Sequence, residues 1–209
     1  MLDFHKIQNT DVNRQPYPYM VITDSIQKES VDGVIASFPN TSGGGSIPVQ
    51  LSELDGDFKS LIEDIEGVQL KDIIQEKFSV DLENKPIVTT VRSLMRQKDG
   101  RIHTDSKSKI ITVLLYLNKD WPSDDAHLRI LNNGKDINDY VEQVRPLAGT
   151  MIIFEVTDNC WHGHTPMVGK RLSLQMNYLV SQSSKTKHSF FHNLSKKIKN
   201  VFGSSNQMS

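Results

Sequence analysis

The stretch IHTDSKSKIITVLLYLN, residues 102–118, sets the pattern for the second half of the chain. Ile102–Asp105 and Ile110–Asn118 are runs of β-forming residues, and a polar turn-forming segment separates them. After Pro86 such runs recur, and we predict further strands at Ile87–Met95, Ala126–Leu131, Tyr140–Val144, Thr150–Val156 and Arg171–Val180. With a strand at Tyr17–Ile22 they number about eight, as in a jelly roll. The predicted fold class is mainly β with flanking helices (α+β), a double-stranded β-helix of the jelly-roll, cupin-like type.

Helical patterns come before most of these strands. Asp24 is the predicted N-cap of a helix that extends to Phe38. Two further apolar stripes have helical spacing and are separated by Gly67: Leu51, Leu54, Phe58, Leu61, Ile62 and Ile65, then Leu70, Ile73, Ile74 and Phe78. A loop over 39–48 has Gly43–Gly45 at its centre, but no Gly-Lys-Ser/Thr follows as in a phosphate-binding loop. We interpret it as a flexible surface loop, with a mobile lid over a site as the alternative.

The chain divides by composition into three parts. Residues 1–85 supply the N-terminal strand and supporting helices, residues 86–180 form the jelly-roll core of the same domain, and residues 181–209 form a basic tail. The tail has five lysines and no acid, and in a helix its apolar residues would share one face. Two interpretations stay open: a solvated or docked tail, or an amphipathic helix that contacts a membrane surface or a partner protein.

Composition excludes several classes of protein. Hydrophobic residues at 37% and charged residues at 23% are typical of a globular chain. The net charge of -1 argues against a nucleic-acid partner. The longest apolar run, Ile110–Leu117, is too short to span a bilayer, and Met1–His5 lacks the layout of a secretory signal. The single cysteine, Cys160, excludes an internal disulfide framework and a cysteine-based metal site. We therefore expect a cytoplasmic protein.

Candidate chemistry begins with the pair His103 and Asp105. Residues two apart in an extended chain point to the same side, so both side chains can reach one point, although this spacing alone is also common in surface turns. A second imidazole follows in the segment WHGHTP, residues 161–166. Two histidines and one carboxylate form the facial set that binds non-haem Fe(II) and leaves coordination positions open. Arg171 lies in a predicted strand and, if buried, needs an anionic partner such as a dicarboxylate.

Five pieces of sequence then occur in one order: His103-x-Asp105, Tyr116-Leu117-Asn118, Val144-x-Pro146-x-x-Gly149, His162-x-x-x-Pro166, and Arg171-Leu172-Ser173. Their order, spacing and strand context resemble the iron(II)/2-oxoglutarate-dependent oxygenases, in the prolyl 4-hydroxylase-like branch. The resemblance covers residues 87–180, with weaker support from residue 16 onward. Each piece is weak by itself, and their agreement carries the resemblance.

The resemblance implies roles for individual residues. His103, Asp105 and His162 would bind Fe(II), and Arg171 would pair with the distal carboxylate of 2-oxoglutarate. Tyr116 and Ser173 would be hydrogen-bond partners at that end of the co-substrate. His164 competes with His162 as the ligand, but the spacings to Pro166 and Arg171 fit His162. The implied co-substrates are 2-oxoglutarate and O2, with ascorbate as an optional addition.

The chain departs from the family pattern in two places. Ser93 stands where an aromatic residue often helps to hold 2-oxoglutarate, about ten positions before the first histidine. Asp125-Ala126-His127 replaces the usual Gly-Gly before the strand that starts Leu128-Arg129. Both departures concern the substrate side of the pocket. Arg92, Arg96 and Arg129 are candidate substrate contacts, with exposed strand or loop charges as the alternative.

The expected activity is hydroxylation of an unactivated C–H bond, with a prolyl residue of a peptide or protein as the family-level substrate. A small metabolite, sugar or lipid intermediate is the alternative substrate, because fold does not determine substrate. A non-catalytic jelly-roll binding module is the alternative from another class. Halogenases of the wider superfamily have a small residue in place of the carboxylate, so Asp105 predicts oxygenation instead of halogenation.

Overall fold

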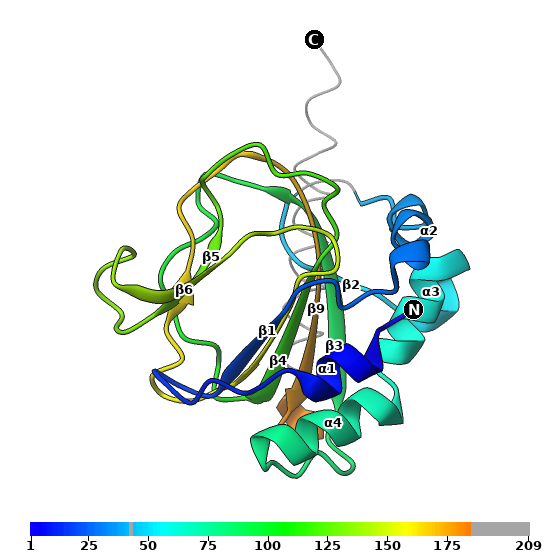
Figure 1. The fold of residues 1–209 in the computed structure, drawn as a ribbon, viewed down its shortest axis with the longest axis horizontal. Coiled ribbons are helices and arrows are strands. Elements are labelled where there is room, and N and C mark those ends of the chain that lie inside the picture. Colours follow the sequence, from blue (N-terminus) through cyan, green and yellow to red (C-terminus); the bar gives the residue numbers. More distant parts are fainter. Residues whose placement is uncertain (42–43, 185–209) are drawn as a thin grey trace.

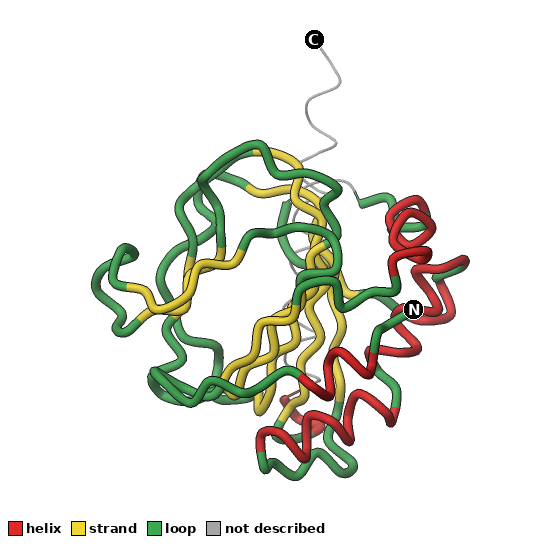
Figure 2. Tube along the Cα trace, in the orientation of Figure 1, coloured by secondary structure: helices red, strands yellow, loops and turns green. Residues whose placement is uncertain are grey.

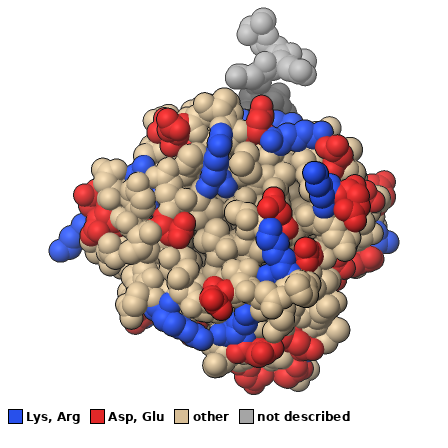
Figure 3. All heavy atoms as spheres, in the orientation of Figure 1, with Lys and Arg blue, Asp and Glu red and all other residues tan. Residues whose placement is uncertain are grey.

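The computed structural model describes residues 1–41 and 44–184, and within them two antiparallel sheets face each other (Figures 1 and 2). The predictions for Gly43 and for the tail from Lys185 onward lie outside the described residues. Over the part that is described, no helix combines the length and the apolar character needed to cross a bilayer. Acidic and basic side chains are interspersed over the face in Figure 3, in keeping with the small net charge.

The larger sheet has six strands in the order β1-β7-β4-β9-β3-β2, and the smaller has three in the order β6-β5-β8. The strands of the larger sheet are β1 Tyr19–Ile22, β2 Ile47–Pro48, β3 Ile87–Met95, β4 Lys109–Tyr116, β7 Met151–Glu155 and β9 Gly169–Leu179. Those of the smaller sheet are β5 Leu128–Leu131, β6 Tyr140–Val144 and β8 His162–Gly163. This arrangement confirms the predicted jelly-roll fold class.

Helices cover one face of the larger sheet, and the smaller sheet lies on the other side (Figure 1). The helices are α1 Phe4–Asn9, α2 Val31–Ala36, α3 Gly56–Ile65 and α4 Val68–Phe78, with short 3-10 turns at Lys28–Ser30 and Leu51–Glu53. From Phe58 onward the predicted apolar stripes are the buried faces of α3 and α4, and Phe58 and Ile74 are fully buried in the main core. The first stripe was predicted to begin at Leu51, but Leu51 lies in a 3-10 turn and is exposed, and α3 starts only at Gly56. Residues 1–85 and the larger sheet therefore share one hydrophobic core.

Strand alternation separates the core from the site. Along β9, Leu172, Leu174 and Met176 belong to the core beneath the helices. The residues that alternate with them, Arg171, Ser173 and Gln175, line the cavity between the two sheets. The same alternation along β4 turns its odd-numbered residues from Ile111 to Leu115 to the helices and Thr112, Leu114 and Tyr116 to the cavity. One face of the larger sheet is thus packed and apolar, while the other carries functional groups.

The prediction that Asp24 caps a helix is wrong. Asp24 has a φ of 49°, the Ser25 amide donates to the Gly149 carbonyl, and Ile26 forms a bridge with Leu2. These tertiary contacts keep the segment out of a helical conformation, and the α-helix starts only at Val31.

One predicted strand is absent from the structure, and one helix was missed. Ile102–Asp105 is not a strand: it contributes a single bridge, from His103 to His162. Helix α1 was not predicted, although Asp3 caps it by accepting a hydrogen bond from the Lys6 amide.

Candidate active site

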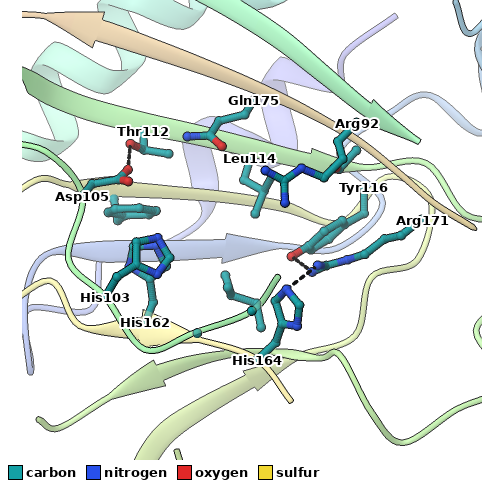
Figure 4. A pocket seen from close by; sticks show the side chains of 15 residues that line it. Arg92, His103, Asp105, Thr112, Leu114, Tyr116, His162, His164, Arg171 and Gln175 are labelled. Carbon is teal, nitrogen blue, oxygen red and sulfur yellow. Dashed lines mark hydrogen bonds between the residues drawn. The ribbon is translucent and has the colours of Figure 1, made fainter. Parts of the chain in front are cut away.

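The backbone brings His103 and His162 side by side. Each residue donates its amide to the other's carbonyl at 3.0 Å, which forms an antiparallel bridge between the β3–β4 connection and β8. The two imidazole ring centroids are 4.3 Å apart. Asp105 follows His103 by two residues and points to the same place (Figure 4). One potential ligand atom from each of His103, Asp105 and His162 lies within 4.8 Å of the others.

Hydrogen bonds to carbonyl oxygens set the tautomer of both histidines. The His103 Nδ1 lies 2.8 Å from the Arg101 carbonyl oxygen, and the His162 Nδ1 lies 2.8 Å from the Cys160 carbonyl oxygen. Since a carbonyl oxygen only accepts, each Nδ1 carries the proton and donates it. Each Nε2 is left with a free lone pair for a metal. Burial, followed by the neighbouring His103, lowers the pKa of His162 to about 4, which keeps this imidazole neutral.

Asp105 is held by two groups. Its Oδ2 accepts a hydrogen bond from the Thr112 hydroxyl at 2.6 Å, and its Oδ1 lies 3.0 Å from the Lys109 ammonium. Burial favours the neutral acid, but Lys109, then His162 and the Thr112 hydrogen bond outweigh it and hold the pKa of Asp105 below its ordinary value. The carboxylate is therefore ionised and oriented. Two imidazoles and one carboxylate, gathered on one side, fit a divalent iron with open positions.

Arg171 lies at the other end of the cavity, and no carboxylate among residues 1–41 and 44–184 pairs with it. It is 5% exposed, and its Nη2 donates to the Tyr116 hydroxyl at 2.6 Å. Its Nη1 donates at 3.0 Å to the Nε2 of His164, whose Nδ1 is bound to the Thr165 carbonyl. The Nε of Arg171 is buried and has no hydrogen-bond partner. A buried guanidinium with neutral partners calls for an anionic ligand.

A cavity of about 140 Å³ joins the two ends. Leu114, Leu128 and Phe154 form apolar walls, and polar groups stand at its ends (Figure 4). Such a cavity can hold a small dianion with one end at the metal and the other at Arg171. His103 is exposed, so the metal position is open on one side.

The structure places most of the predicted site residues in this cavity. Tyr116, Ser173 and Arg92 line it together with Arg171 and the three potential metal ligands. His164 lies at the arginine end and contacts Arg171, so it is outside the metal cluster.

Arg96 and Arg129 do not line the cavity. The Arg96 guanidinium binds the Asp99 carboxylate, with an Nη2–Oδ1 distance of 3.0 Å. Arg129 stacks on the Tyr140 ring at 4.7 Å and donates to Asn138. Their local partners therefore hold both side chains elsewhere.

The residue of β3 that faces the cavity near the expected co-substrate position is Arg92, whereas the sequence predicted Ser93 there. The Ser93 hydroxyl bonds to Thr41, and it is Arg92 that faces the cavity. A register irregularity in the β3–β9 pairing between Arg92 and Leu94 marks this point of the strand. The residue of the β3 strand that faces the co-substrate region is therefore basic.

Sequence reasoning missed three groups in and around the cavity: Thr112, Lys109 and Gln175. Thr112 and Gln175 share the cavity face with Tyr116 and Arg171, so strand alternation counted from those residues would have found them. Lys109 is the first residue of β4 and shows no comparable signal, because its contact with Asp105 depends on the fold of the preceding turn.

Fold and site together place a cluster of three potential metal ligands opposite a buried arginine in one cavity of a jelly roll. Residues 91–179 match the sequence model of the 2OG-Fe(II) oxygenase superfamily. Over these residues the chain is similar to 2-oxoglutarate- and Fe(II)-dependent oxygenases, and His103, Asp105 and His162 fit the metal that the family binds. No curated protein matches the sequence.

Solved structures share the fold at low sequence identity. A prolyl-4-hydroxylase from Pseudomonas putida is 16% identical, covers 84% of this chain and 96% of its own, and has a TM-score of 0.59. HygX from Streptomyces hygroscopicus, with nickel and 2-oxoglutarate bound, is 12% identical with a TM-score of 0.53, over 78% of this chain and 82% of its own. A prolyl hydroxylase from Trichoplax adhaerens, in complex with a hypoxia inducible factor peptide fragment, is 13% identical with a TM-score of 0.51. The match covers 85% of this chain and 87% of its own.

Proposed function

We propose that this chain hydroxylates an unactivated C–H bond, and that a prolyl residue of a peptide or protein is its substrate. The observation that carries the reaction type is the cavity itself. Three potential ligands converge at one end, and at the other stands a buried arginine that has no anionic partner within the part of the chain that the structure describes. A binding module of the same fold has no need of both features.

Each residue would have a distinct task. His103, Asp105 and His162 would hold the iron, with their free lone pairs and carboxylate already oriented. Arg171 and Tyr116 would bind the distal carboxylate of 2-oxoglutarate and so direct its other end to the metal. Bound iron and 2-oxoglutarate supply the oxygen activation, with succinate and CO2 as the co-products. Leu114, Leu128 and Phe154 would exclude water from the reacting groups.

The choice of substrate rests on the relatives. Two of the compared structures are prolyl hydroxylases, and one of them binds a peptide fragment. The exposed His103 side of the metal site leaves access for a chain that approaches from solvent. A small metabolite, sugar or lipid intermediate is the competing substrate class.

Succinate release tests the reaction type. The full chain with Fe(II), O2 and 2-oxoglutarate is expected to form succinate, and a proline-containing peptide is expected to raise the rate and gain 16 mass units, that is one oxygen atom. Absence of succinate under all conditions would refute the oxygenase mechanism. Succinate without peptide oxidation, but with oxidation of a small metabolite, would replace the prolyl substrate by the competing class.

A further inference from the structure

Arg92 is a second guanidinium in the same cavity. It lies on β3, directly opposite Ser173 of β9, so the two side chains share the inner face of the sheet. In the view of Figure 4 its guanidinium points into the cavity, between the metal ligands and the Tyr116–Arg171 pair. Arg92 therefore faces the space where substrate and co-substrate meet.

No acidic group of the described residues neutralises Arg92. Its Nη2 donates to the Ser46 hydroxyl at 3.1 Å, which is a neutral partner. Asp99, the carboxylate whose charge acts on it, already binds the Arg96 guanidinium. Burial, together with the nearby Arg171 and Arg96, outweighs the opposing charge of Asp99 and lowers the pKa of Arg92, so the site compensates its charge only in part.

The charges of the cavity do not balance even with the co-substrate in place. Asp105 is the single acid among the described residues that line it, and Lys109 already pairs with Asp105. A bound 2-oxoglutarate would bring two negative charges, one for the metal end and one for Arg171. The divalent metal and Arg92 would then leave the cavity positively charged, and Arg92 would still lack a partner.

We propose that Arg92 binds a carboxylate of the substrate that is oxidised, so that the enzyme selects substrates with an anionic group close to the reacting C–H bond. This inference rests on the proposed function. A free amino acid can supply the carboxylate, as can an acidic side chain beside the target residue of a peptide. Both would form the charge-assisted hydrogen bonds that a planar guanidinium favours.

Binding of matched pairs tests this without turnover. The full chain, loaded with Zn(II) and 2-oxoglutarate, is titrated by calorimetry with the free L-amino acids and their neutral amides. A second series uses end-blocked Asp-Pro and Asn-Pro peptides, which separates the two sources of the carboxylate. In one of the series the wild-type protein is expected to bind the carboxylate at least about tenfold more tightly than its neutral counterpart.

Variants assign the preference to Arg92. Arg92→Gln is expected to reduce the carboxylate-to-amide ratio to within about twofold, and Arg92→Lys to keep part of it. Arg14→Gln removes an exposed arginine that bonds to the Lys77 carbonyl and should keep the wild-type ratio. Thermal melting checks that each variant folds. If Arg92→Gln does not fold, the carboxylate-to-amide ratio of Arg92→Lys is the measurement that tests the role of Arg92.

Several results would overturn the proposal. Equal binding of carboxylates and amides by the wild type would do so, as would an unchanged ratio in Arg92→Gln. Loss of 2-oxoglutarate affinity in Arg92→Gln, as large as in Arg171→Gln and with the ratio intact, would reassign Arg92 to the co-substrate. The iron-loaded wild type is assayed alongside: if it releases no succinate, the oxygenase function fails, whereas succinate without charge preference refutes the role of Arg92 alone.

Discussion

Replacing Thr112 by valine should weaken metal binding without altering any metal ligand. Valine keeps the shape of threonine but removes the hydroxyl that donates to Asp105 Oδ2 at 2.6 Å. The hydroxyl also lies 3.0 Å from the Asn177 oxygen, but it has one proton, and the nearer, charged carboxylate is the stronger acceptor.

The expected size follows from these contacts. A hydrogen bond to a charged group contributes about 1.5–3 kcal/mol, which corresponds to roughly 10–100-fold in affinity. The Lys109 ammonium still holds Oδ1 in the variant, so Asp105 keeps one of its two partners. We therefore expect the Kd for the metal to rise by about tenfold, the lower end of what loss of a ligand's supporting hydrogen bond causes.

Calorimetric titration of the metal-free protein with Mn(II) measures the effect, and Thr90→Val is the matched control. Thr90 is also buried, on β3, and its hydroxyl makes only a long 3.5 Å contact with the Gln175 carbonyl. Thr90→Val should bind Mn(II) as the wild type does. If Thr112→Val binds Mn(II) within twofold of the wild type while both variants fold, Thr112 does not orient Asp105 for the metal.

Four further changes probe the site and the core. Asp105→Ala should abolish succinate-coupled hydroxylation, and retention of full turnover would contradict its assignment as a ligand. Arg171→Gln should raise the KM for 2-oxoglutarate by about 10–100-fold, because a charge-assisted pair becomes a neutral one; an unchanged KM would place the co-substrate elsewhere. Gly163→Ala should destabilise the protein and weaken metal binding, since the added Cβ would meet backbone atoms of Arg101 and Ile102 at 3.1 Å, next to His103 and His162; wild-type melting and metal affinity would argue against this crowding. Phe58→Ala should cost about 3–5 kcal/mol of unfolding free energy in denaturant titration, and a loss below 1 kcal/mol would mean that α3 is not part of the cooperative core.

The metal end of the site could be predicted because its signals are local or carried by a resemblance. His103 and Asp105 are two residues apart, and the spacing from His162 to Pro166 and Arg171 survives in the sequence. The apolar stripes of α3 and α4 were equally clear, since helical periodicity repeats over several turns.

The remaining features depend on contacts between distant segments. Asp24 is a residue type that often caps helices, but the neighbouring Ser25 amide donates to the Gly149 carbonyl and no helix starts there. Arg92 and Arg129 both looked like exposed strand charges or substrate contacts. Only pairing with β9 turns Arg92 inward, and only the Tyr140 ring draws Arg129 away.

The alternation along β9 makes this strand sensitive to changes in length. If one residue were inserted before Arg171 and the pairing of β9 shifted by one residue, every side chain of the shifted part would change faces. Leucines would enter the cavity, and Arg171 would be pressed against the helices. Such an insertion would abolish both activity and folding. The loops at either end of the strand could change length without either loss.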